Sequence, residues 1–421
     1  MMSNLACDVL IIGAGPAGLA AACTAAQSGQ SVLMLDDNPN PGGQIWRDGP
    51  GVMLPVLAQQ YRQAVGALNN VTLLNAVKIV AHCGRQQILY EGAVGSGLVD
   101  YQRLILCCGA RELLLPFPGW TLPGVTGAGG LQAQIKQGLQ IKGERVAIAG
   151  SGPLLLAVAD SVTKAGGDVV LLAEQASARR LAGFASGLWR WPTKLHQSLT
   201  LLHRRYRPDS YVLAALGGQR LEAVRVQQGR RVAMLPCDRL ACGFGLVANI
   251  ELAMHLGCRI SNYRVAVDEW QQTSVPQIYA AGDCTGVGGS ELALAEGAIA
   301  GYAATGNMEQ AQALMVQRDK WRHFARAVER AFMLNPALKA LAMSDTLLCR
   351  CEDVPLGQVC EFSGWSAAKL GSRCGMGACQ GKICATAARH LFGWPLVAPR
   401  IPLTPARTET LARLGRTESD G

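Results

Sequence analysis

The order of apolar runs and glycine turns at the start of the chain predicts a strand, a turn, a helix and a second strand. Residues 9–12 (VLII) form a continuous apolar run, and the glycine-rich residues 13–18 (GAGPAG) follow at once. Residues 19–28 are rich in alanine, and a second apolar run at 32–35 ends on Asp36. This order of elements is typical of the βαβ unit that binds a dinucleotide.

The glycines of this turn have separate physical tasks. Gly13 permits the tight turn, Gly15 lets the backbone approach a pyrophosphate, and Gly18 lets the helix pack close to the strand. The helix N-terminus favours negative charge. Asp36 can accept hydrogen bonds from ribose hydroxyls. Because every flanking element is present, the turn is interpreted as a dinucleotide site rather than a structural turn.

The same pattern returns in the middle of the chain. Residues 145–149 predict a strand, 150–153 (GSGP) a turn and 154–165 a helix, and the strand after them ends on Glu174. The third glycine position holds Leu155, which narrows the space for a pyrophosphate. We therefore expect a second Rossmann-like domain whose dinucleotide is absent or altered. If it bound a nicotinamide cofactor, Glu174 would favour NAD over NADP.

Composition and charge exclude several classes of protein. Hydrophobic residues make up 49% of the 421 residues and charged ones 16%, which is enough apolar material for a large core and too much for a disordered chain. No apolar run reaches the ~18 residues of a membrane-spanning helix, and the N-terminus does not resemble a signal peptide. A cytoplasmic protein is expected, with peripheral placement at the inner membrane left open.

The net charge of +9 has no pattern that points to nucleic acid. Small basic clusters occur at 179–180, 204–207 and 230–231, and no basic helix with interleaved aromatic residues is seen, so nucleic-acid binding is not expected. Plain solvated faces, an anionic membrane surface and an acidic partner subunit stay open as readings of these clusters. The six histidines form no pair with metal or triad spacing, and no catalytic residue is predicted.

The fifteen cysteines carry a second chemical signal. In a cytosolic chain they are not expected to form disulfides, so a cluster at ligand spacing indicates metal. Six of them fall within 36 residues near the C-terminus, at positions 349, 351, 360, 374, 379 and 384. Soft thiolates suit an iron–sulfur cluster or zinc. A structural zinc site and buried free thiols are the alternatives.

Several segments together resemble a known family. They are residues 36–47 (DDNPNPGGQIWR), 109–112 with 115–125, 242–249, and the Gly282-Asp283 turn after an apolar strand. These segments are similar to the family that contains the B subunit of hydrogen cyanide synthase, the A subunits of octopine and nopaline oxidases and the α subunit of D-hydroxyproline dehydrogenase. The resemblance implies FAD in the first unit, held by Gly13, Gly15, Pro16, Ala17, Gly18, Asp36, Asp37, Gly43, Gln44, Arg47, Gly109, Ala110, Gly282 and Asp283.

The C-terminal cysteines strengthen this resemblance. Residues 349–352 (CRCE) and 373–384 (RCGMGACQGKIC) are similar to a bacterioferritin-associated-ferredoxin-like domain. The resemblance implies a [2Fe-2S] cluster on Cys349, Cys351, Cys379 and Cys384, with Cys374 as a spare thiol.

The fold class that follows is α/β. We expect a two-dinucleotide-binding-domain flavoprotein whose second Rossmann-like unit is inserted in the first. The predicted FAD-binding domain is discontinuous, at residues 1–115 and 275–310, and the second Rossmann-like domain spans 116–274. A helical connector at 311–344, a [2Fe-2S]-binding domain at 345–395 and a C-terminal tail at 396–421, which docks or hangs free, complete the chain.

The resemblance also implies a function. The chain would be the electron-transfer subunit of a multi-subunit flavin-dependent amine or imino-acid dehydrogenase. Its expected partners are a catalytic subunit similar to D-amino-acid oxidase, a small ferredoxin-like subunit, a respiratory quinone or another electron carrier, and FMN at a subunit interface. The alternatives are a self-sufficient NAD(P)H-dependent flavoprotein reductase, a non-catalytic iron–sulfur scaffold and a glycerol-3-phosphate dehydrogenase relative.

Overall fold

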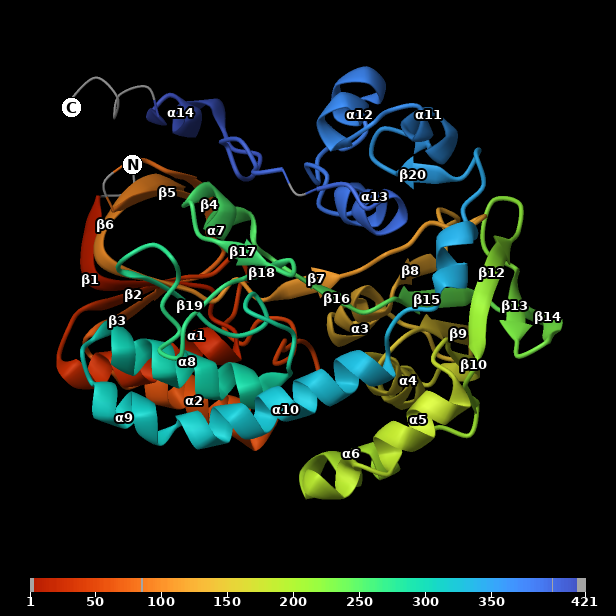
Figure 1. Cartoon of the computed structure of the whole chain (residues 1–421), viewed down its shortest axis with the longest axis horizontal. Coiled ribbons are helices and arrows are strands. Elements are labelled where there is room, and N and C mark those ends of the chain that lie inside the picture. Colours follow the sequence, from red (N-terminus) through yellow and green to blue (C-terminus); the bar gives the residue numbers. More distant parts are fainter. Residues whose placement is uncertain (1–3, 85, 396, 415–421) are drawn as a thin grey trace. The chain divides into compact units, whose positions relative to one another are not determined.

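The computed structural model describes residues 4–84, 86–395 and 397–414 and divides the chain into two compact units. Unit 1 holds the chain up to Arg111, then Val247–Ala325 and the residues from Ala398. Unit 2 holds Glu112–Leu246 and Arg326–Val397. Figure 1 labels the elements of both units.

The core of unit 1 is a sheet in the order β3-β2-β1-β6-β5-β4, in which β19 also pairs with β6. Strands β1, β2, β3, β6 and β19 run parallel, whereas β4 and β5 pair antiparallel. The apolar runs in β1 and β2 are buried on both faces, as expected for parallel strands under helices. The strands are Leu5–Ile12 (β1), Val32–Leu35 (β2), Val71–Leu74 (β3), Lys78–His82 (β4), Gln87–Gly92 (β5), Gly95–Leu106 (β6) and Ile278–Ala280 (β19).

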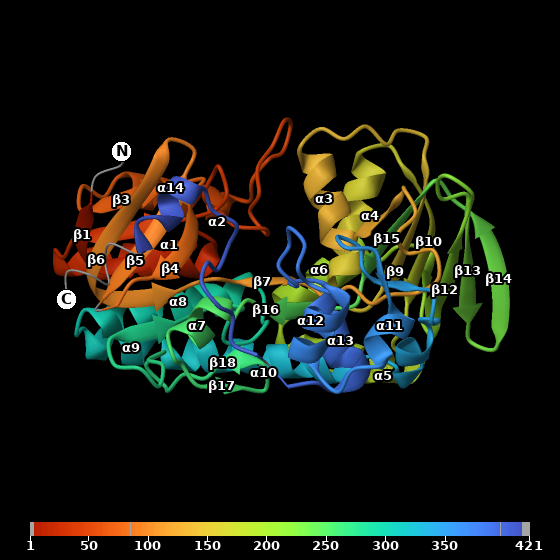
Figure 2. The same ribbon diagram turned by 90° about the horizontal axis from the view of Figure 1, so that it is seen from above.

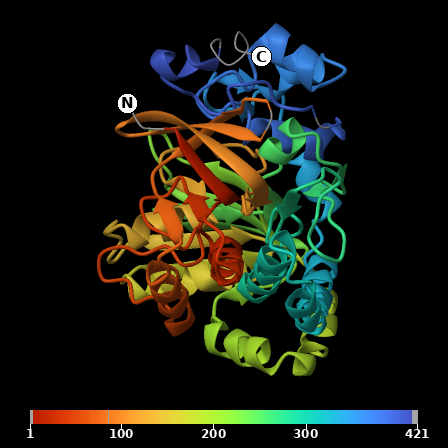
Figure 3. The same ribbon diagram turned by 90° about the vertical axis from the view of Figure 1, so that its left-hand side faces the viewer.

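Helices α1 (Pro16–Ala25) and α8 (Ser290–Ala304) lie side by side against this sheet, as Figures 1 and 3 show. Their closeness depends on small residues. A Cβ at Gly297 would collide with the carbonyl of Ala17, and a Cβ at Gly301 with that of Ala21. The other helices and short strands of this part of the chain are α2 (Val56–Gly66), α7 (Glu251–His255), α9 (Met308–Ala313), α10 (Met315–Ala331), α14 (Thr408–Leu411), β7 (Ala110–Glu112), β16 (Leu246–Ala248), β17 (Ile260–Ser261) and β18 (Arg264–Val265).

Unit 2 contains a parallel sheet in the order β11-β10-β9-β15-β8 and an antiparallel sheet β12-β13-β14. The strands are Val125–Gly127 (β8), Arg145–Gly150 (β9), Asp168–Glu174 (β10), Tyr206–Arg207 (β11), Ser210–Leu216 (β12), Ala223–Gln228 (β13), Arg231–Pro236 (β14) and Arg239–Gly243 (β15). The helices are α3 (Ala128–Lys136), α4 (Leu154–Lys164), α5 (Ala178–Ala185) and α6 (Pro192–Leu201).

The cysteine-rich segment of unit 2 has a small core of its own. Leu348, Val359 and Ala368 are buried there with Cys349, Cys374 and Cys384. The indole N–H of Trp120 donates to the carbonyl of Leu347 at 2.7 Å. The segment is built from β20 (Leu347–Cys349), β21 (Val354–Pro355), α11 (Leu356–Cys360), α12 (Trp365–Ser372) and α13 (Cys384–Phe392). Figure 2 shows its three helices close together.

The C-terminal residues dock on unit 1. The N–H of Leu403 donates to the carbonyl of Val80 at 2.8 Å, and the Thr404 hydroxyl donates to that of Ile79 at 3.0 Å. Leu411 packs on a small cluster that contains Val80 and Leu89. Of the two states expected for this tail, the described residues 397–414 adopt the docked one.

The predicted fold class is confirmed, since both glycine turns lie between a parallel strand and a helix. The two units differ from the predicted domains at several boundaries. Residues 247–274 belong to unit 1, because Val265 and Gln271 bond to the strand and turn around β19. Residues 345–395 fall within unit 2. Among the described residues, no helix is both long and apolar enough to cross a bilayer.

Candidate functional site

The first glycine turn lies at the carboxyl edge of the unit 1 sheet. Gly13 has φ of +103°, and a Cβ there would collide with the carbonyl of Cys107. A Cβ at Gly18 would collide with the carbonyl of Gly13, so α1 approaches the turn as closely as glycine permits. At Gly15 the space is open, since a Cβ would meet only the Cα of Gly43, at 3.9 Å. The turn is therefore packed tightly from below and open where a pyrophosphate would lie.

Pro16 and Ala17 begin α1 directly above this turn. Pro16 occupies the first helical position, where its missing N–H leaves no bond unmade. The first turn of α1 contains no acidic side chain. The positive end of the helix macrodipole thus faces the open side of Gly15, which suits a bound phosphate.

Asp36 reaches back from the end of β2 to the same turn. Its carboxylate accepts from the backbone N–H of Ala14, from the N–H of Asn38 at 2.7 Å and from the Asn38 amide at 2.8 Å. Asp36 is 4% exposed, whereas the neighbouring Asp37 is exposed. The position fits the predicted ribose-binding acid, and Asn38 emerges as a supporting residue that the motif alone did not identify.

Three predicted residues lie on the loop between β2 and α2. Gly43 has φ of +60° and packs against Gly15. The Arg47 guanidinium donates to Asn38 at 2.9 Å and to Gln44 at 2.8 Å, and its buried Nε has no partner among the described residues. A buried donor without a partner costs about 1–3 kcal/mol, so Arg47 fits a missing acceptor such as a cofactor oxygen.

Gly109 and Ala110 follow β6 and are held by the segment after β16. The carbonyl of Gly109 accepts the N–H of Asn249 at 3.0 Å, and the Asn249 amide donates to the carbonyl of Cys108 at 2.8 Å. Arg111 pairs with Glu251 at 2.7 Å. The family-like segments around residues 109 and 249 are therefore one structural feature of unit 1.

Gly282 and Asp283 form the turn after β19, and a buried carboxylate on α8 holds this turn. Glu296 accepts from the N–H of Gly282 at 3.2 Å and from the Thr285 hydroxyl at 2.8 Å. Its other oxygen accepts from Arg322 at 2.9 and 3.1 Å. Burial raises the pKa of Glu296 against the effect of Arg322. Sequence reasoning missed Glu296 and Arg322, because neither belongs to the glycine or Gly-Asp motif.

Asp283 is itself half-buried. Burial raises its pKa, and the N–H of Gly288 donates to its carboxylate at 3.2 Å. A Cβ at Gly282 would come within 2.8 Å of the Ala17 side chain, so this turn lies directly against the start of α1. The predicted residues of unit 1 thus converge from β1, β2, β6 and β19 on one edge of the sheet.

The second glycine turn differs because the chain itself covers it. The Ser151 hydroxyl donates to the carbonyl of Phe332 at 3.0 Å, and the Gln175 amide donates to Ser151 at 2.8 Å. The side-chain Oε1 of Gln175 accepts from the backbone N–H of Asn335 at 2.7 Å. Leu155 is fully buried in the core between α4 and the sheet.

Glu174 is fully buried at this second turn, and each of its two oxygens accepts from the chain's own backbone. Its carboxylate accepts from the N–H groups of Gly152 and Ala176, both at 2.8 Å. Burial raises the pKa of Glu174 to about 7. Residues 332–335 occupy the face of the turn that a dinucleotide would need.

Five C-terminal cysteines gather in two groups. The Sγ atoms of Cys349, Cys374 and Cys384 lie within 4.8 Å of one another and are buried. Those of Cys351 and Cys379 lie 3.8 Å apart nearer the surface. A hydrogen bond with Cys374 and burial both raise the pKa of Cys384, so its thiol stays protonated until a metal binds. Cys360 is exposed and lies outside both groups.

The two thiol groups fit a metal centre. A [2Fe-2S] cluster needs two thiolates on each iron. The Cys351–Cys379 pair would supply two of them, and two thiols of the buried group would supply the others. Of the four predicted ligands, Cys349 and Cys384 lie in the buried group with Cys374, and Cys351 and Cys379 form the pair nearer the surface. Glycines are required around the thiols, since a Cβ at Gly377 would collide with that of Cys351.

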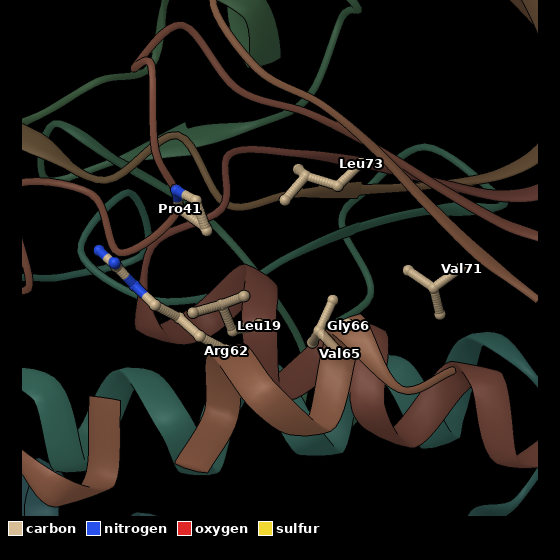
Figure 4. Close-up of a pocket in the computed structure, with 7 residues that line it drawn as sticks. All are labelled: Leu19, Pro41, Arg62, Val65, Gly66, Val71 and Leu73. Atoms are coloured by element: carbon tan, nitrogen blue, oxygen red, sulfur yellow. The ribbon is translucent and has the colours of Figure 1, made fainter. Parts of the chain in front are cut away.

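A cavity of about 350 Å³ in unit 1 lies apart from these features. Figure 4 shows it between α1, α2 and β3, with Arg62 at one side. The Arg62 guanidinium pairs with Asp48 at 2.8 Å and donates to the carbonyl of Trp46 at 2.9 Å. None of the predicted flavin residues is among those that line it: Leu19, Pro41, Arg62, Val65, Gly66, Val71 and Leu73.

The fold and the open glycine turn define a flavoprotein oxidoreductase with two dinucleotide-binding folds. The family model of pyridine nucleotide-disulphide oxidoreductases matches residues 7–313. The hydrogen cyanide synthase subunit HcnB of Pseudomonas aeruginosa is 30% identical, over 96% of this chain and 98% of that protein. The A subunit of the opine oxidase of Agrobacterium tumefaciens is 29% identical, over 97% of this chain and 92% of that protein.

Solved structures show the same fold. An L-proline dehydrogenase from P. horikoshii superposes with a TM-score of 0.74 at 19% identity and covers 98% of this chain and 81% of its own. A thioredoxin reductase from T. acidophilum superposes with a TM-score of 0.55 at 20% identity, over 72% of this chain and 99% of its own.

The chain belongs to the pyridine nucleotide-disulphide oxidoreductase family, among the relatives of HcnB and of the opine oxidase A subunits. It is a flavin-dependent oxidoreductase subunit, and its family supports FAD as the cofactor. The predicted resemblance is confirmed.

Proposed function

We propose that this chain is the electron-transfer subunit of a multi-subunit flavin-dependent amine or imino-acid dehydrogenase. The observation that carries the proposal is the contrast between the two glycine turns. The first is open at Gly15, while residues 332–335 cover the second through Ser151 and Gln175. A chain with an open first turn and a covered second turn would bind FAD and receive its electrons from a donor other than NAD(P)H.

The names of the relatives support an electron donor in a separate subunit. Hydrogen cyanide synthase and opine oxidase are both named as proteins with subunits. We take the partner to be a catalytic subunit similar to D-amino-acid oxidase, which oxidises the C–N bond of an opine, hydroxyproline or similar amine. An FMN at the subunit interface and a small ferredoxin-like subunit belong to the same proposal.

The cofactor chemistry matches a relay. A bound flavin takes two electrons as a hydride, and an iron–sulfur cluster passes electrons singly. In this chain the open turn at Gly15 and the unpaired Nε of Arg47 would bind the FAD, with Glu296 fixing the Gly282 turn against it. Cys349, Cys351, Cys379 and Cys384 would hold a [2Fe-2S] cluster that hands electrons to a quinone or another respiratory carrier.

The test is an anaerobic visible spectrum of the purified chain, first alone and then co-expressed with the products of its neighbouring genes. We expect flavin and iron–sulfur absorption that NADH does not bleach, and bleaching by an amine once the partner is present. Bleaching of the lone chain by NADH would overturn the proposal and make the chain a nicotinamide-dependent reductase. A cluster without any reducible flavin would favour the iron–sulfur scaffold instead.

A further inference from the structure

The positive charge of the chain is concentrated in one segment of unit 2. Residues 175–208, between Glu174 and Asp209, contain seven of the 39 basic residues and none of the 30 acidic ones. This segment therefore contributes seven of the nine net positive charges, and the remainder of the chain is close to neutral. The basic residues are Arg179, Arg180, Arg190, Lys194, Arg204, Arg205 and Arg207.

The segment forms the outlying helices of unit 2. It runs from the end of β10 through α5 and α6 to β11, and Figures 1 and 3 show α6 as an outer helix of this unit. None of the side chains of α5 or α6 is fully buried. The six arginines are exposed, and so are three large apolar side chains, Trp189 at 67%, Leu199 at 65% and Leu202 at 63%.

The hydrogen bonds and ring contacts of these arginines leave their positive charges in place. Arg180 donates to the carbonyl of Met333 at 3.1 Å, and Arg207 donates to the carbonyls of Arg204 and Tyr206 at 3.1 and 2.9 Å. The guanidinium of Arg190 lies over the ring of Trp189, 5.4 Å from its centroid. Carbonyls and aromatic rings orient a guanidinium without neutralising its charge.

We propose that residues 175–208 bind an anionic lipid bilayer at its surface. Exposed arginines among tryptophan and leucine side chains are the composition of an interfacial segment, in which the apolar groups enter the headgroup region and the cations face lipid phosphates. The exposed leucines favour a bilayer over a nucleic acid, because a nucleic acid offers no apolar phase to them. The segment places this side of unit 2 at the membrane, where a lipid-soluble electron acceptor would be found.

The experiment is co-sedimentation of the purified full chain with large unilamellar vesicles. One set contains phosphatidylcholine alone, and the other contains phosphatidylcholine with phosphatidylglycerol. We expect binding to the anionic vesicles only, and loss of most of it when the salt concentration is raised, since screening shortens the reach of the charges. Equal binding to both sets, or none to either, would overturn the proposal.

Two matched variants locate the binding surface. Arg204→Gln with Arg205→Gln should weaken binding about thirtyfold, since each basic side chain near an anionic surface adds about 1 kcal/mol. Arg230→Gln with Arg231→Gln removes the same charge from an exposed pair at the β13–β14 turn and should leave binding within about twofold. If both variants lose binding equally, the effect is one of net charge and the proposed surface is wrong.

A third variant separates insertion from simple attraction. Trp189→Ala keeps every charge and should still weaken vesicle binding several-fold. The blue shift of tryptophan fluorescence that the protein shows on binding anionic vesicles should also be smaller in this variant. Unchanged binding and emission would contradict an interfacial role for this side chain. Vesicle binding needs neither substrate nor partner subunit, so its result is independent of the proposed electron-transfer function.

Discussion

The hydroxyl of Ser151 donates a hydrogen bond to the carbonyl of Phe332, 181 residues further along the chain, at 3.0 Å. Ser151 stands between the two glycines of the second turn, where a dinucleotide-binding protein presents backbone N–H groups to a pyrophosphate. Phe332 also packs against Phe184, with ring centroids 5.7 Å apart. Unit 2 thus retains the Rossmann-like framework and uses its nucleotide face for an internal contact.

This internal contact can be tested by weakening it. Gln175→Ala removes the acceptor of the Asn335 N–H, and one lost hydrogen bond of about 1 kcal/mol should speed exchange of that amide about fivefold. Hydrogen exchange followed by mass spectrometry measures the change. Gln140→Ala serves as the control, because the exposed Gln140 side chain donates to the nearby carbonyl of Gly138. Unaltered exchange at 333–335 in the Gln175 variant would show that other contacts hold the segment.

The two glycines of the first turn should respond differently to alanine. In Gly15→Ala the new methyl group enters open space, so folding should be retained while FAD affinity falls at least tenfold. In Gly18→Ala the methyl group collides with the Gly13 carbonyl, and we expect destabilisation by about 1–3 kcal/mol. FAD titration and urea unfolding of the apoprotein measure the two effects. An apoprotein destabilised as strongly by Gly15→Ala would contradict the open site.

Glu296 should affect flavin retention indirectly, because it holds the Gly282 turn in place. Glu296→Gln removes the ionic partner of Arg322, which keeps its hydrogen bond to Gln271. Because Arg322 is 28% exposed, we expect the free energy of unfolding to fall by about 3 kcal/mol, near the lower limit for a broken buried pair. The FAD-to-protein ratio after gel filtration should fall accordingly. The matched control is Glu309→Gln, an exposed acid in the first turn of α9. Full FAD content in Glu296→Gln would show that Glu296 is not needed to retain the flavin.

Cysteine variants test the proposed cluster ligands one by one. Alanine at Cys349, Cys351, Cys379 or Cys384 should reduce bound iron from about two atoms per chain to nearly none. Cys374→Ala should retain most of the iron, although its Sγ lies within 4.8 Å of Cys349 and Cys384. Iron analysis and the visible spectrum distinguish the variants. Iron loss in Cys374→Ala with retention in one of the other four would reassign the ligand set.

Glu174 makes the stability of unit 2 depend on pH. Its pKa rises from 4.5 to about 7 because the side chain is buried, so the folded state binds the proton more tightly than the unfolded state. This contribution to stability is full below pH 4.5 and is lost as the pH rises through 7, by about 3 kcal/mol in total. Urea unfolding at pH 5 and pH 8 should show a steeper decline for the wild type than for Glu174→Gln. Parallel curves would contradict the raised pKa.

The local motifs of both dinucleotide folds could be predicted because they depend on neighbours in the sequence. The predicted strand at 32–35 is β2 in the structure, and the predicted helix at 154–165 is α4 to within one residue. Gly13 and Gly18 could be assigned their roles because a turn and a close helix approach exclude a Cβ at short range. The residues that support the site over a long range in the sequence could not be predicted in this way. Glu296 and Arg322 lie 26 residues apart and bear on a turn whose motif contains neither of them.

The sequence by itself therefore determined the fold class, the first nucleotide turn and the presence of a thiol cluster. Each of these depends on the local spacing of residues and on the periodicity of apolar positions. Tertiary structure alone decided that the second turn is covered, because its covering segment comes from residues 332–335. It also decided that Cys374 joins Cys349 and Cys384. The physical reason is that burial and hydrogen bonding between distant segments depend on how the chain packs, and no local pattern records which carbonyl a given hydroxyl will meet.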